Sequence, residues 1–66
     1  MKITLNGSPH NCPDNINATD FLAALEMQDQ RIALEINKEI VTRSDYDSHR
    51  LNEGDIVEVI QAIGGG

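Results

Sequence analysis

Only one stretch of this chain has the hydrophobic spacing of an α-helix, and alternating polar and apolar segments precede and follow it. Its apolar residues recur at intervals of three and four, which places them on one helix face: Ala18, Phe21, Leu22 and Leu25. Asn17 is a favourable N-cap with Asp20 three residues later, so the pair predicts where the helix begins. We expect the helix to fade near Met27–Asp29. In a chain of 66 residues a single helix can bury its apolar face only against a sheet.

Three of the remaining segments predict strands because their apolar residues recur at every second position, and two shorter strands are expected after the turns described below. The expected strands are Lys2–Leu5, His10–Cys12, Ile32–Ile36, Glu39–Val41 and Ile56–Gln61. Asn6-Gly7 predicts a tight type I′ hairpin turn, since both central residues of that turn need a positive φ. Pro9 has no N–H to donate and therefore indicates a strand at the sheet edge.

Short polar segments connect the later strands. Asn37-Lys38 predicts a second tight turn, and Glu53–Asp55 predicts a turn in which Gly54 takes a positive φ. Residues 42–52 are polar, so we expect an irregular segment with one helical turn near Ser44–Asp47.

The order of these elements predicts an α+β fold, the ubiquitin-like β-grasp. In this fold one helix packs on one face of a mixed sheet of four to five strands. The helix also provides a crossover that lets two strands run parallel. The same order fits other small α+β rolls. We expect residues 1–61 to form the β-grasp domain and residues 62–66 to form a flexible C-terminal glycine tail.

Size and charge exclude several classes of function. A chain of 66 residues is too small to enclose a deep substrate pocket, which argues against a self-contained enzyme. Its 11 acidic and 5 basic residues give a net charge of −6. This charge disfavours binding to nucleic acid and to anionic membrane surfaces. A single cysteine excludes an internal disulfide, and no signal peptide is visible. We therefore expect a cytoplasmic protein.

The glycine run Gly64, Gly65 and Gly66 follows the last expected strand almost directly. Fully extended, these residues would project the terminal carboxylate roughly 10 Å beyond Ile63. A bare backbone fits a narrow channel, so we expect this tail to enter the active sites of partner enzymes. The Gly66 carboxylate is then the reactive group, and it needs activation, most simply as an acyl-adenylate. A frayed chain end is the alternative.

Apolar residues beside the tail suggest where a partner docks. If Val57 and Val59 face the core, then Ile60 lies on the opposite sheet face, which no helix covers. We expect Ile60, Ala62 and Ile63 to contact a partner, with Ile40 or Val41 extending the patch.

Cys12 invites a catalytic or metal-binding interpretation because His10 and Asp14 stand two residues to either side. Pro13 interrupts the segment, and three ligands make an incomplete zinc site. A single cysteine in a small domain is more often a buried apolar residue. We therefore assign no catalytic residue and no metal. A thiol enzyme at Cys12 remains the alternative.

Four segments resemble the ThiS family of sulfur carriers: Met1–Gly7, Phe21–Leu25, Ile32–Val41 and Glu53–Gly66. The terminal Gly65-Gly66 is also found in ubiquitin and in the molybdopterin carriers of the MoaD type. The short length and the segment Ala33–Val41 favour ThiS. Gly65 and Gly66 correspond to the family's terminal diglycine, and Gly64 is an additional glycine before it.

The resemblance implies a reaction course for the tail. A ThiF-type adenylating enzyme would use ATP to adenylate Gly66, so the chain itself binds no cofactor. A cysteine desulfurase or sulfurtransferase would then supply sulfur to form a thiocarboxylate. A ThiG-type thiazole synthase would take this sulfur into the thiazole ring of thiamine. The alternatives are a MoaD-like carrier for molybdopterin or another acceptor, and a noncovalent ubiquitin-like interaction module.

Overall fold

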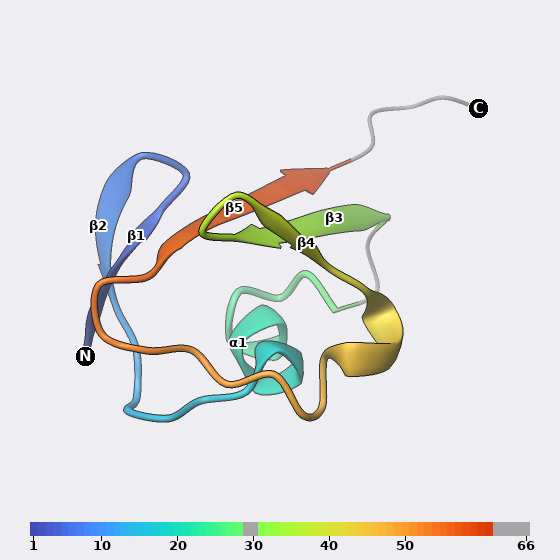
Figure 1. Ribbon diagram of the computed structural model, residues 1–66, viewed down its shortest axis with the longest axis horizontal. Helices are drawn as coiled ribbons and strands as arrows, with labels where there is room; N and C mark the ends of the chain where they lie inside the picture. The colour runs from blue at the N-terminus through green and yellow to red at the C-terminus, as the bar shows by residue number, and fades with distance from the viewer. Residues whose placement is uncertain (29–30, 62–66) are drawn as a thin grey trace.

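The computed structural model describes residues 1–28 and 31–61, and it contains one mixed sheet with one α-helix against it (Figure 1). The strand order is β2-β1-β5-β3-β4. The strands are β1 (Lys2–Leu5), β2 (Ser8–Asn11), β3 (Ile32–Ile36), β4 (Glu39–Val41) and β5 (Ile56–Gln61). The central pair β1 and β5 runs parallel and the other pairs run antiparallel. The predicted β-grasp fold is confirmed.

Helix α1 (Ala18–Ala24) begins where the sequence predicts and ends earlier. Asn17 is the N-cap, and its Oδ1 accepts the backbone N–H of Asp20 at 2.8 Å. The helix ends because Glu26 adopts a left-handed φ of 59°. The Met27 N–H then donates to the Leu22 carbonyl at 2.9 Å, and that of Glu26 to Ala23 at 3.0 Å. This is a Schellman C-cap, so the expected end near residues 27–29 is wrong.

No helix in the described part of the chain combines the length and the apolar character that crossing a membrane requires.

The predicted hairpin turn is confirmed, with φ of 49° at Asn6 and 83° at Gly7. Because this turn has only two residues, β2 begins at Ser8, which pairs with Leu5. The predicted strand His10–Cys12 therefore starts too late, and Cys12 lies beyond the strand. The strand β2 forms an edge of the sheet, as Pro9 indicated.

The core lies between α1 and one face of the sheet. Its buried residues are Ile3, Ala18, Phe21, Leu22, Leu34, Ile36, Val41, Leu51, Val57 and Val59. Val57 and Val59 face inward, which is the condition under which the sequence places Ile60 on the opposite sheet face. Leu51 is a core residue within the segment 42–52, which the sequence marks only as polar.

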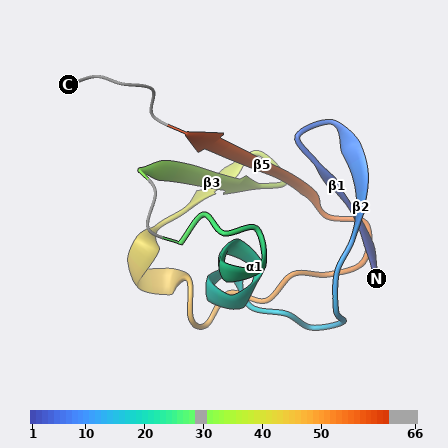
Figure 2. The same cartoon turned by 180° about the vertical axis from the view of Figure 1, so that it is seen from behind.

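The segment from Thr42 to Asp55 crosses beneath the sheet and packs along α1 (Figures 1 and 2). It starts with a 3₁₀ turn, η1 (Arg43–Asp45), one residue before the predicted turn. Backbone bonds join it to the residues around the helix start: Ala18 N–H to the His49 carbonyl, and Leu51 N–H to the Ile16 carbonyl, both at 2.9 Å. No element formed by residues 1–28 or 31–61 covers the other face of the sheet (Figures 1 and 2).

Candidate functional site

The sheet face opposite α1, here called the open face, carries three large exposed apolar side chains. Ile40 is 70% exposed, Ile56 51% and Ile60 49%. Ile60 thus lies where alternation with Val57 and Val59 placed it. Val41 is buried, so of the two residues expected to extend the patch only Ile40 does so. Figure 2 shows α1 on one side of the sheet and no described element covering the other.

Strand pairing fixes which side chains are neighbours on the open face. Ile60 on β5 lies opposite Ala33 on β3, and Glu58 lies opposite Glu35. Glu35 in turn lies opposite Ile40 on β4. The carboxylates of Glu35 and Glu58 therefore lie at the centre of the open face. The three exposed isoleucines surround them on three sides.

The last described residue, Gln61, ends β5 at the edge of the open face, where it pairs with Ile32. At this end β5 is paired with β3 alone, because β1 pairs only with Ile56 and Val57 at the start of β5. The predicted site residues Ala62, Ile63, Gly64, Gly65 and Gly66 lie outside the described residues. Their predicted roles stay predictions, as does docking through Ile60.

A hollow of about 400 Å³ lies beside the end of β5. Its lining residues are Arg31, Ile32, Ala33, Arg43 and Ile60. Sequence reasoning did not single out the two arginines, because they come from separate segments that meet only in the folded chain. Their guanidinium groups place positive charge near the end of β5.

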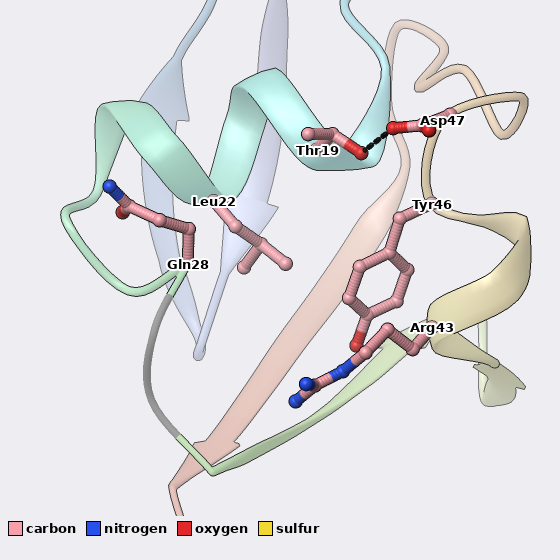
Figure 3. Close-up of a pocket in the computed structure, with 6 residues that line it drawn as sticks. All are labelled: Thr19, Leu22, Gln28, Arg43, Tyr46 and Asp47. Carbon is pink, nitrogen blue, oxygen red and sulfur yellow. Dashed lines mark hydrogen bonds between the residues drawn. The ribbon is translucent and has the colours of Figure 1, made fainter.

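A second hollow of about 280 Å³ separates α1 from the segment that contains η1 (Figure 3). Its lining residues are Thr19, Leu22, Gln28, Arg43, Tyr46 and Asp47. The Thr19 hydroxyl donates to the Asp47 carboxylate, and the Thr19 N–H donates to the Tyr46 carbonyl at 3.3 Å. These bonds tie the segment to the helix, so we assign this hollow a structural role.

Cys12 and its neighbours do not converge on a site. The His10 ring packs edge-on against the Phe21 ring with 5.9 Å between ring centroids. The Asp14 carboxylate is 3.1 Å from the α-amino group of Met1. Within residues 1–28 and 31–61, no three His, Cys, Asp or Glu side chains are grouped to hold a metal ion.

Burial raises the pKa of the Cys12 thiol. The carboxylates of Asp14, Glu53 and Asp55 raise it further, while the positive N-terminus lowers it. The thiolate, the nucleophilic form, is therefore disfavoured at neutral pH. This environment is unsuited to a catalytic cysteine.

The structure is a small β-grasp domain. Its open face includes the end of β5, where Ile60 is exposed. The sequence model of the ThiS family matches residues 3–66, nearly the whole chain. The chain belongs to the ThiS family. The predicted resemblance to ThiS is thus confirmed.

Solved and curated ThiS proteins support the same assignment. The crystal structure of the thiamine biosynthesis protein ThiS from Geobacter metallireducens superposes with a TM-score of 0.87 and 33% identity, covering both chains in full. The sulfur carrier protein ThiS of Escherichia coli is 30% identical over the full length of both chains.

Two further relatives are larger proteins. The thiazole synthase of Magnetococcus marinus is 41% identical to this chain over 66 residues, and that of Paramagnetospirillum magneticum is 35% identical. In both cases the whole chain matches, yet it spans only 20% of the length of the synthase. A ThiS-like segment therefore occurs within the same polypeptide as a thiazole synthase.

Proposed function

We propose that this chain carries sulfur as a thiocarboxylate on Gly66 and donates it for synthesis of the thiazole part of thiamine. The observation that carries the proposal is the ThiS family match, which extends through residue 66 and so includes the glycine end. A relative named as a sulfur carrier, which matches over the full length of both chains, supports it. The small size of the chain supports a role as a protein co-substrate.

The chemistry requires help from larger enzymes. A carboxylate resists nucleophiles, so a ThiF-type enzyme would join Gly66 to the AMP part of ATP and release pyrophosphate. The terminal sulfur of a persulfide on a cysteine desulfurase or sulfurtransferase would then attack the acyl carbon and displace AMP. A second thiol would reduce the resulting acyl disulfide and release the thiocarboxylate. ATP serves as a substrate of the adenylating partner, and the carrier needs no cofactor of its own.

A ThiG-type thiazole synthase is the proposed sulfur acceptor. Its support is the pair of thiazole synthases that contain a segment matching this whole chain. An enzyme that takes sulfur from the tail must hold the body while the tail reaches its active site. We propose that Ile60, with Ala62 and Ile63, contributes to this docking, because Ile60 is exposed beside the end of β5.

The test is the intact mass of the chain after incubation with ATP, the adenylating enzyme and a persulfide sulfur donor. We expect the mass to rise by the difference between one sulfur and one oxygen atom. Deletion of Gly65 and Gly66 should abolish the shift, and so should one residue added after Gly66. Both variants should unfold like the wild type, because they leave the described residues unchanged. An unchanged mass for the wild type would refute the proposal.

A further inference from the structure

Glu35 and Glu58 face each other across adjacent antiparallel strands in the middle of the open face. Directly opposed side chains in such a pair have Cβ atoms about 4.5–5.5 Å apart, and two like charges there are destabilising. Glu58 is exposed and Glu35 is partly buried. Folding therefore brings two negative charges together.

Neither carboxylate has a hydrogen-bond or ion-pair partner among residues 1–28 and 31–61. Arg31 is four residues from Glu35 along the chain, a separation of about 13 Å in an extended strand. Lys38 lies beyond the end of β3, in the turn to β4. Arg43 lines the hollow beside Ala33 and Ile60, and no ion pair joins Arg31, Lys38 or Arg43 to either glutamate within the described residues.

Apolar side chains border the pair on three sides, and polar Asn6 lies on the β1 side, where its N–H donates to the Val57 carbonyl and its Oδ1 accepts the Val59 N–H. Ile40 lies beside Glu35, and Ile56 and Ile60 are the nearest residues to Glu58 on the same side of β5. A partner that covered only these isoleucines would also remove the carboxylates from water, at a considerable free-energy cost. An apolar partner surface without a cation is therefore a poor match for the open face.

We propose that Glu35 and Glu58 jointly receive one arginine side chain of the thiazole synthase, which is flanked by apolar residues packing on Ile40, Ile56 and Ile60. This inference rests on the proposed function, because it assumes the thiazole synthase as partner. Arginine suits the site better than lysine, since its planar guanidinium group has five N–H donors and can bond both carboxylates at once. The pair thus makes docking selective for a partner with a cation at this position.

The test compares binding of the purified thiazole synthase from the same organism to the wild type and to two variants, Glu35→Lys and Glu58→Lys. Each variant should raise Kd by about tenfold or more, because the arginine would meet a positive charge. Glu39→Lys is the matched control with the same change of charge. Glu39 is exposed and pairs with buried Ile36, which places it on the other side of the sheet. Its Kd should stay within about twofold of the wild-type value.

A second measurement needs no partner. Glu58→Gln should raise the thermal midpoint of the free chain, and added salt should reduce the gain, because salt screens the repulsion. Glu39→Gln should leave the midpoint unchanged. A midpoint that Glu58→Gln does not raise would overturn the proposal, and so would equal losses of binding for Glu39→Lys and Glu58→Lys.

The outcomes also separate this inference from the proposed function. If the wild type becomes a thiocarboxylate while Glu58→Lys binds the synthase normally, only the arginine site is refuted. If Glu58→Lys impairs binding to the adenylating enzyme alone, the synthase is the wrong occupant and the proposal falls. If the wild type gains no sulfur at all, the proposed function fails and this inference fails with it.

Discussion

The side chains of Asn37 and Asp55 join the turn after β3 to the residue that precedes β5, with Nδ2 of Asn37 donating to Oδ1 of Asp55 at 3.1 Å. Asp55 is buried, and its Oδ2 accepts the backbone N–H of Asn52 at 2.8 Å. Oδ1 of Asn37 accepts the backbone N–H of Ile56 at 3.0 Å. Together these bonds hold the start of the middle strand against its neighbour.

Replacing Asp55 should therefore weaken the fold. Asp55→Ala removes the acceptor for two donors, and one of them is a backbone N–H that is left without its partner. We expect a loss of about 1–3 kcal/mol in the free energy of unfolding, measured by urea denaturation. Glu39→Ala, at an exposed carboxylate, is the control and should change it by less than about 0.5 kcal/mol. Equal effects would contradict the proposed role of the buried carboxylate.

Asn6 serves the fold in two separable ways. Its φ of 49° belongs to the hairpin turn, and its Oδ1 accepts the backbone N–H of Val59 at 2.9 Å. Asn6→Gly keeps the easy positive φ and loses only the side-chain bond, at a cost of about 1 kcal/mol. Asn6→Ala should cost more, because it also places a side chain in a strained conformation. Equal unfolding free energies for the two variants would show that the backbone conformation contributes nothing.

Leu51 should be among the most sensitive positions of the chain. It is 1% exposed and packs in the core under the sheet. Leu51→Ala should lower the free energy of unfolding by about 2–5 kcal/mol, enough to unfold much of a domain this small. Circular dichroism during thermal unfolding measures the effect. Ile40→Ala, at an isoleucine that is 70% exposed, should leave the transition nearly unchanged.

The raised pKa of Cys12 predicts slow alkylation. Only the thiolate reacts, so the pH midpoint of the reaction with iodoacetamide should be higher in the folded chain than in the urea-unfolded chain. Cys12→Ser should retain conversion to the thiocarboxylate, because sulfur is carried on Gly66. Loss of conversion in a folded Cys12→Ser variant would instead favour the thiol-enzyme alternative.

Ile60 provides a test of docking that spares the core. Because it is 49% exposed, Ile60→Ser should change stability little. It should raise the Kd for the thiazole synthase several-fold. Ile56→Ser, farther from the chain end on the same strand, shows whether the effect depends on proximity to the tail. An unchanged Kd for Ile60→Ser would remove this residue from the docking surface.

Local features of the fold were predictable because neighbouring residues determine them. The Asn17 cap, the Asn6-Gly7 turn and the bounds of β5 depend on hydrogen bonds and φ preferences within a few residues. The end of α1 was mispredicted because apolar spacing continues to Leu25, while the left-handed φ of Glu26 turns the chain away. Leu51 was missed because a single apolar residue in a polar segment has no periodicity.

The class of fold, the glycine run and the family could be predicted from the residues alone, since these depend on residue order and local pattern. The folded chain was needed to show that Glu35 faces Glu58, that Arg31 and Arg43 line one hollow, and that the Asn37 side chain donates to Asp55. Each of these relationships joins segments that are distant along the chain. Their contact depends on strand register and on the path of the loop beneath the sheet, which a single sequence does not specify.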